Sequence, residues 1–442
     1  MAGNDLTIYG VTTDGFVAYY DHVHSTIDVV SVNGGTPTQI TATPGSNFAI
    51  FPQEQAVLVW TGLDGENVGS LLVWTNLDGV HALSTSSGAP NAVVDATSRY
   101  VMYENNVNET AATVAVYGAL TDGSSATPLI SGVAWPDDGI ATAGNYAVLS
   151  YALAGAVTVS SYTLETWAAT ILTSSIVPGT TTVAGFDSAG TKALILNASN
   201  SLDIFPIASA TPTLIAAGVT TATTGSSAIL STSGNTVFYA GGGGATIDRS
   251  TTITPSSTVL SNGTDLSLYA VSPNEATLLA YGGATPPSNV YFESASTFGG
   301  SPTVLTPATG FGGALYTNDS SHILYISNYS DTTGIGTLSS FSTSAGTSST
   351  LSTTFATYSP YDSSKIVFTD NVVANTAEIK VLDTAGTAAP TVIATAVQSF
   401  TASSSVPTVG WGLATTGATT SIVYFGTAQG TRAAGIYVTP LP

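Results

Sequence analysis

Apolar and polar positions form a pattern that returns ten times along the chain, at intervals of roughly 40 to 56 residues. Each round has a short first segment, a polar turn, a strongly apolar second segment, a polar loop, an alternating third segment and a short closing segment. The second segments are rich in branched and aromatic residues and lie at 16–20, 57–60, 100–103, 146–149, 193–196, 237–239, 278–281, 323–326, 366–368 and 422–425. Short apolar runs bounded by turn-forming residues predict strands buried on both faces. No window has a useful length of helical periodicity, so the chain is predicted to be all-β.

The residues just before the second strands predict tight hairpins. The sequence is TDG at 13–15, SAG at 188–190 and SPNE at 272–275. Asp, Asn, Gly and Pro supply the positive or preset φ that such turns need. First and second strands are therefore expected to pair antiparallel.

The closing segments are the most repetitive part of each round. They read PTQI at 37–40, PTLI at 212–215, PTVL at 302–305 and PTVI at 390–393. Because Pro cannot donate a ladder hydrogen bond, a strand that starts with Pro belongs at a sheet edge. Four antiparallel strands in each of many rounds are typical of β-propeller blades.

Two motifs carry a resemblance to a known family, the TolB-type, WD40-like propeller repeats. The sequence SPNEATLLAY at 272–281 resembles their SPDG-x-x-hydrophobic signature, and NGGTPTQIT at 33–41 is similar to their GG-x-P-x-x-L-T ending. The resemblance covers the whole chain, with degenerate motifs elsewhere. It implies a propeller fold more than a particular role, since such repeats occur in proteins of many functions.

The rounds also bear on the number of rings. Nine rounds have a closing strand, and the tenth stops after its third strand at 435–442. Two tandem rings of five would each need a closure, yet the fifth and sixth rounds are complete. We therefore predict one β-propeller domain over residues 1–442, a single ten-bladed ring of four-stranded antiparallel blades, with two tandem smaller propellers as the alternative. The last blade is expected to have three strands unless a segment preceding this sequence completes it.

The charge of the chain limits which partners it can bind. The 442 residues include 27 acids but only 6 Lys and Arg, for a net charge of −21, and no cysteine. Nucleic acid and anionic membrane surfaces are excluded because both require clustered cations. No apolar run is long enough to span a bilayer. A surface of Thr, Ser, Gly and Asn with few cations favours an extracytoplasmic, bacterial protein (secreted, periplasmic or on the cell surface), and we expect a monomer.

In a propeller, the loops between second and third strands share one face with the connections between blades, and this face commonly binds partners. Here those loops make the face acidic, although the opposite face also carries acids. The acidic face could bind a cation or a basic partner, or its charge could serve solubility. Its acids are Asp21, Asp64, Glu66, Glu104, Glu109, Asp331 and Asp370.

One of these loops is a candidate metal site. His22 and His24 are two residues apart on an extended segment and should point the same way, with Asp21 beside them. Zinc would need a further ligand from elsewhere in the chain. The alternative is a solvated loop.

A second candidate lies at a connection between blades. Trp135 precedes the paired carboxylates of Asp137 and Asp138, a combination that could bind a sugar or Ca²⁺. Trp411 enters a first strand at a comparable place, so the two indoles could line one mouth of the channel. The alternative is a turn with a packed Trp.

The usual catalytic constellations are missing. No cysteine is present, only four His could act as bases, and a Gly-x-Ser-x-Gly elbow would need a helix. We therefore predict a non-enzymatic extracytoplasmic scaffold that binds a protein, a glycan or another ligand. The alternative is a carbohydrate-active hydrolase or lyase with carboxylates at the channel mouth, about 5 to 9.5 Å apart in one pocket. A third possibility is a module of a larger surface assembly that self-associates.

Overall fold

A computed structural model gives the fold of the chain. It describes residues 6–42, 44–45, 47–134, 139–153, 156–175, 182–197, 199–222, 225–283, 289–294, 303–330, 333–360, 364–373, 376–385, 389–401, 407–409, 411–416, 419–427 and 434–442. Within these ranges the regular structure is strand throughout, without a helix. The prediction of an all-β chain is thus confirmed.

The first five rounds fold into five four-stranded sheets, numbered 1 to 5 in chain order. Sheets 1 and 2 consist of β1 (Leu6–Val11), β2 (Phe16–Asp21), β3 (Thr26–Ser31), β4 (Thr38–Thr41), β5 (Phe48–Gln53), β6 (Ala56–Thr61), β7 (Val68–Thr75) and β8 (Gly79–Gly88). Sheets 3 to 5 consist of β9 (Ala92–Val94), β10 (Tyr100–Asn108), β11 (Thr113–Leu120), β12 (Thr127–Ala134), β13 (Gly139–Ala143), β14 (Tyr146–Leu153), β15 (Ala156–Thr163), β16 (Ala169–Ser175), β17 (Thr182–Phe186), β18 (Lys192–Leu196), β19 (Leu202–Pro206) and β20 (Thr213–Ala216).

The next three rounds form sheets 6 to 8 in the same way. Their strands are β21 (Ala228–Leu230), β22 (Thr236–Gly241), β23 (Thr246–Thr251), β24 (Thr258–Asn262), β25 (Ser267–Val271), β26 (Thr277–Gly282), β27 (Asn289–Ser294), β28 (Thr303–Pro307), β29 (Gly313–Tyr316), β30 (His322–Ser330), β31 (Ile335–Ser342) and β32 (Thr347–Phe355). In all eight sheets, strands that follow one another in sequence pair antiparallel.

The strands of the last two rounds form two groups that hydrogen bonding connects, and we number these groups sheet 9 and sheet 10. Sheet 9 contains β33 (Tyr358–Pro360), β34 (Lys365–Val373), β35 (Thr376–Asp383) and β36 (Thr391–Thr401), with β37 (Pro407–Val409) paired to the end of β36. Sheet 10 contains three strands, β38 (Trp411–Thr416), β39 (Thr419–Gly426) and β40 (Gly435–Pro440). The single residue pair Val397–Gly426 joins the two groups. Within the described residues sheet 10 thus departs from the four-stranded pattern, as expected from its missing closing segment.

The second strand of each sheet is buried because both faces of the sheet are covered. In β6 the five residues from Ala56 to Trp60 are all buried, and β22 is buried from Val237 to Gly241. A strand covered on one face alone would alternate between buried and exposed positions. Each sheet is therefore packed between two neighbours, as in a propeller blade.

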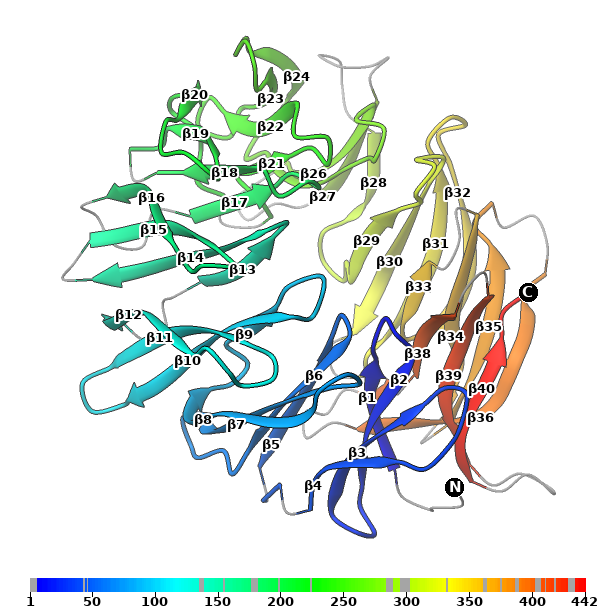
Figure 1. Ribbon diagram of the computed structural model, residues 1–442. Helices are drawn as coiled ribbons and strands as arrows, with labels where there is room; N and C mark the ends of the chain where they lie inside the picture. Colours follow the sequence, from blue (N-terminus) through cyan, green and yellow to red (C-terminus); the bar gives the residue numbers. More distant parts are fainter. Residues whose placement is uncertain are drawn as a thin grey trace.

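The buried side chains show which sheets are neighbours. The described residues contain ten apolar clusters, of which nine join two successive sheets. One cluster contains Tyr19 of sheet 1 together with Phe425 of sheet 10. In Figure 1 the sheets stand around a common centre, with the first strands (blue) beside the last (red). The contact between first and last sheets favours one closed ring over two tandem rings.

The outer edge of the sheets has a recurring irregularity. In each of the nine sheets with a fourth strand, the register between third and fourth strands shifts at a bulge, as between Ile27 and Asp28. Bulges twist an edge strand and interrupt its unpaired backbone groups. The outer edges are thus poor templates for pairing with another chain.

A buried polar cap recurs at the turn between first and second strands. In six sheets a Thr, Ser or Asp side chain accepts the backbone N–H that starts the second strand. These residues are Thr12, Asp95, Asp187, Ser231, Ser272 and Thr317. The predicted hairpin turns are present, and the caps satisfy N–H groups that burial would otherwise leave without a partner.

Candidate functional site

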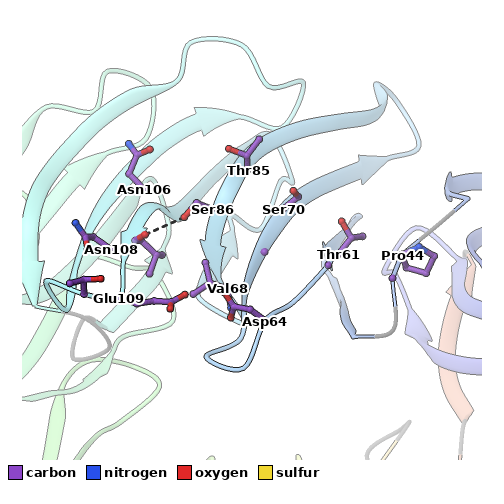
Figure 2. Close-up of a pocket in the computed structure, with 15 residues that line it drawn as sticks. Pro44, Thr61, Asp64, Val68, Ser70, Thr85, Ser86, Asn106, Asn108 and Glu109 are labelled. Atoms are coloured by element: carbon purple, nitrogen blue, oxygen red, sulfur yellow. Dashed lines mark hydrogen bonds between the residues drawn. The ribbon is translucent and has the colours of Figure 1, made fainter.

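A hollow of about 840 Å³ lies between sheets 2 and 3, on the face formed by the loops between second and third strands. It is lined by the loop 61–70 of sheet 2, by residues 85–86 of β8, by residues 106–110 of sheet 3 and by residues 44–45, which precede sheet 2. Figure 2 shows Asp64 and Glu109 among these residues, contributed by adjacent sheets. None of the lining residues is Lys, Arg or aromatic.

Asp64 organises the wall of the hollow that sheet 2 contributes. Its Oδ1 accepts the backbone N–H groups of Val68 and Glu66 at 2.9 and 3.0 Å. Asn67 has a φ of 62°, a left-handed conformation that Asn tolerates better than most residues. At Gly69 a Cβ atom would lie 2.5 Å from the Thr61 carbonyl oxygen, so the close approach of β6 and β7 requires glycine there.

The opposite wall comes from the turn after β10. The Asn108 Oδ1 accepts the backbone N–H of Ala111 at 3.0 Å, which folds the turn back toward β11. The Ser86 hydroxyl of β8 donates to the Val107 carbonyl at 3.3 Å, the contact drawn dashed in Figure 2. Hydrogen bonding between neighbouring sheets thus fixes the position of Glu109 relative to sheet 2.

The two carboxyl groups of the hollow interact directly. The hydrogen bond with Asp64 is the main cause that raises the pKa of Glu109, and the negative charges of Asp64 and Glu66 act in the same direction. The pKa of Asp64 is lowered, chiefly by the N–H of Val68. The pair therefore keeps one negative charge on Asp64 while Glu109 holds its proton to a higher pH than an ordinary glutamate.

Asp21, His22 and His24 do not form a common metal site. The His24 Nδ1 lies 2.8 Å from Asp21 Oδ2, whereas the His22 Nε2 lies 2.8 Å from the Thr7 hydroxyl. Burial acts against the charge of Asp21, but its hydrogen bonds from His24 outweigh this effect and lower its pKa; the same contact raises the pKa of His24. Across the described part of the chain, no group of three or more His, Asp or Glu side chains could hold a metal ion.

Two acids assigned to the acidic face are turned inward. Glu104 is fully buried and accepts the Asn91 amide at 2.8 Å. Asp370 is 9% exposed and forms an ion pair of 2.8 Å with Lys380. Their charges are used inside the protein, so of the predicted acids Asp64 and Glu109 are the two that meet in the hollow.

The aromatic candidates lie apart from this hollow. Trp411 is half-buried on β38 and packs against the apolar cluster between sheets 9 and 10. Its indole N–H is buried, with no hydrogen-bond partner within the described ranges. Trp135, Asp137 and Asp138 lie outside the described residues, as does Asp331, so the sugar or Ca²⁺ site stays a prediction.

The repeat pattern predicts that the loops 61–70 and 104–111 lie on one face, but it does not reveal the contact between them. The polar residues Asn106, Asn108 and Ser86 that shape the hollow were not singled out. The available signal was the pair of loops longer than a tight turn in adjacent rounds, both carrying acids. Longer loops on a rigid scaffold are where binding residues concentrate.

Comparisons with known proteins find likeness in architecture. No protein-family profile matches the chain. No curated protein matches it either. Among the solved structures, a eukaryotic initiation factor is 12% identical with a TM-score of 0.48, and the match covers 88% of this chain and 86% of that one.

Two further structures belong to groups that the repeats resemble. The C-terminal WD40 domain of Sif2 is 12% identical with a TM-score of 0.40, over 78% of this chain and 93% of that one. TolB from Acinetobacter baumannii is 13% identical with a TM-score of 0.33, over 65% of this chain and 78% of that one. No helix among the described residues is long and apolar enough to cross a membrane. WD40 and TolB proteins are thus among the structures that this chain is similar to.

Proposed function

We propose that the chain is one propeller domain over residues 1–442 that acts as a non-enzymatic scaffold and binds a basic segment of a partner protein in the hollow between sheets 2 and 3. The observation that carries this proposal is the interacting pair Asp64 and Glu109 in a hollow without a lining cation. Two carboxylates held side by side repel each other, and a Lys or Arg side chain placed between them relieves this repulsion and supplies several hydrogen-bond donors at once.

The lining of the hollow favours a basic peptide over a glycan. Sugar rings commonly pack on aromatic side chains, and the hollow has none among its lining residues. Its neutral polar groups, the Asn, Ser and Thr side chains, can accept or donate hydrogen bonds to a peptide backbone. The net charge of −21 adds a long-range attraction for a basic partner that salt would weaken.

The carboxyl pair does not suit glycoside hydrolysis. Retaining and inverting glycosidases hold their two carboxyl groups about 5 to 9.5 Å apart, so that a sugar or a water fits between them. The interaction with Asp64 raises the pKa of Glu109, but no aromatic side chain lines the hollow to hold a sugar ring beside the pair. Both are exposed at an open surface, where water competes with any developing charge.

An extracytoplasmic location, either secreted, periplasmic or at the cell surface, is part of the proposal. Its support is compositional: 6 Lys and Arg among 442 residues and an abundance of neutral polar residues. Fractionation of the native cells, with the chain detected by antibody, tests this part separately. Recovery in the cytoplasmic fraction would contradict it.

The binding test uses fluorescence anisotropy with a labelled Lys/Arg-rich peptide and a charge-reversed Glu-rich peptide. The double variant Asp64→Asn/Glu109→Gln keeps the hydrogen-bond acceptors and removes both charges. We expect it to weaken binding of the basic peptide by about tenfold or more, because both negative charges that face the peptide are removed. Binding should also weaken at acidic pH as Glu109 takes up its proton.

A matched control removes two charges elsewhere. Asp122→Asn/Glu165→Gln changes exposed acids outside the hollow and removes the same two negative charges from the total. Equal losses in the two double variants would show a general field effect and contradict the proposed site.

A further inference from the structure

A second pocket lies where tight turns of sheets 1, 2 and 3 meet, on the face opposite the hollow. Its volume is about 160 Å³, close to that of a cavity that holds one benzene molecule. The turns between first and second strands of sheets 1, 2 and 3 contribute Asp14, Gln55 and Arg99. The turn between third and fourth strands of sheet 2 contributes Leu77 and Asp78.

Arg99 is unusual among the few cations of this acidic chain. Lys380 is ion-paired with Asp370, and the Lys192 Nζ donates to the Gly234 carbonyl at 2.8 Å. The Arg99 guanidinium lies 5.4 Å from the centre of the Tyr100 ring and, within the described residues, makes no ion pair or side-chain hydrogen bond. Its planar donors are therefore open to a carboxylate, which an arginine binds with two parallel hydrogen bonds.

The acids of the pocket add a complementary charge. Asp14 accepts the Thr12 hydroxyl at 2.6 Å, and Asp78 accepts the Thr75 hydroxyl at 3.2 Å. Both are exposed and retain acceptor capacity, since an ionised carboxylate has about four lone-pair positions. A simple anion on Arg99 would be repelled by these acids and by the net charge of −21, whereas a neutral zwitterion would not.

Leu77 provides an apolar contact at the same place. Its side chain is 90% exposed, the highest exposure among the large apolar residues described. It lies between Asn76 and Asp78 in a tight turn, and it lines the same pocket as Arg99 and Asp14. A ligand with a small apolar group could cover Leu77 and remove it from water.

We propose that this pocket binds a free α-amino acid with an apolar side chain, such as valine: its carboxylate on Arg99, its ammonium group toward Asp14 and Asp78, and its side chain on Leu77. The site does not depend on the hollow of the other face. It would give the scaffold a small-molecule ligand in addition to a protein partner.

Isothermal titration calorimetry of the full chain tests the site with L-valine, N-acetyl-L-valine and L-valine amide. The free amino acid should bind, and each blocked form should bind at least about tenfold more weakly, because it lacks one charged contact. The blocked forms also separate a free amino acid from a peptide terminus. Absence of valine binding, or equal binding of either blocked form, would overturn the proposal.

Three variants locate the binding. Arg99→Gln should weaken valine binding by about tenfold or more, with Arg99→Lys in between because lysine lacks the two-pronged geometry. Leu77→Ser should reduce the preference for valine over glycine and leave glycine binding unchanged, and Glu165→Gln serves as the exposed-acid control. Unchanged melting curves identify folded variants. Retained affinity in folded Arg99→Gln, or an unchanged valine preference in Leu77→Ser, would place the ligand elsewhere.

Discussion

One hydrogen bond recurs in six sheets: a buried side chain in the turn between the first and second strands accepts the backbone N–H that starts the second strand. Ser272 is 2% exposed, and its Oγ accepts the backbone N–H of Thr277 at 2.9 Å. The same hydroxyl reaches the Asn274 Oδ1 at 2.8 Å, and the Asn274 N–H donates to Ser320 of the next sheet. One buried hydroxyl thus links the start of a strand to the contact with a neighbouring blade.

Replacement of Ser272 tests this role. Ser272→Ala should lower the free energy of unfolding by about 1–3 kcal/mol, because it leaves a buried N–H without its acceptor. Ser272→Thr should change it by less than about 0.5 kcal/mol, since Thr12 and Thr317 occupy the equivalent position in other sheets. Urea unfolding of the three proteins measures both values. An equal loss in both variants would show that the site responds to any change of volume rather than to the missing acceptor.

At this scale the sequence predicted where turns occur but not which residue caps them. Asp, Asn, Gly and Pro identify a turn through their own conformational preferences. Capping depends instead on the position of the next strand, which brings Thr277 to Ser272. The same limit explains Glu104, whose burial against Asn91 follows from packing between residues thirteen positions apart.

Among the elements, β34 illustrates how two sheets are held together by charge. Asp370 accepts the hydroxyls of Ser352 and Thr354 of β32, at 2.7 and 2.6 Å, and pairs with Lys380 of β35. Burial disfavours its charge, but these hydrogen bonds outweigh burial and lower the pKa of Asp370 to about 2. The contact thus stabilises the junction of sheets 8 and 9 while the carboxylate is ionised.

A pH series tests this contact. A carboxyl group with a pKa lowered on folding adds stability above its ordinary pKa, and this stability is lost as the pH falls through the folded value. Asp370→Asn should therefore cost about 1–2 kcal/mol at pH 7, reduced by partial exposure to water. The difference from the unmodified chain should shrink between pH 4 and pH 2. Unfolding midpoints at each pH measure it, and a constant difference would contradict the assigned role.

The strands themselves were largely predictable, because a buried strand leaves a continuous apolar run in the sequence. The second strands of all ten rounds fall where those runs lie. The extension of β36 beyond the PTVI segment into a hairpin with β37 was not predicted. Its pairing partner comes later in the chain and has no counterpart in the other rounds, so the repeat pattern could not predict it.

For the whole molecule, the sequence predicted the number of repeated sheets more firmly than the closure of these sheets into one ring. The rounds can be counted along the chain, whereas closure depends on contacts between its two ends. In the structure, Val11 of β1 and Gly412 of β38 provide such a contact, and Phe425 and Tyr19 share the apolar cluster beside it. The hollow depends on the same ring, because it forms where loops of adjacent blades meet on one face.

The most direct test of the closed ring is a disulfide across the closure. A Cβ atom built on Gly412 lies 3.4 Å from the Cβ of Val11, near the roughly 3.5–4.5 Å that a disulfide spans. The 442 residues contain no cysteine that would compete. The pair Gly139→Cys/Ser150→Cys, at 3.8 Å within sheet 4, is a positive control that does not depend on ring closure.

Non-reducing electrophoresis of oxidised Val11→Cys/Gly412→Cys gives the answer. A closed ring predicts an intramolecular disulfide that forms as readily as the control and shifts the mobility of the monomer until a reductant is added. The control pair must form its disulfide for the result to count. If it does, and the Val11→Cys/Gly412→Cys thiols stay free or form disulfides only between chains, the result would contradict a single ring in which the last sheet packs against the first.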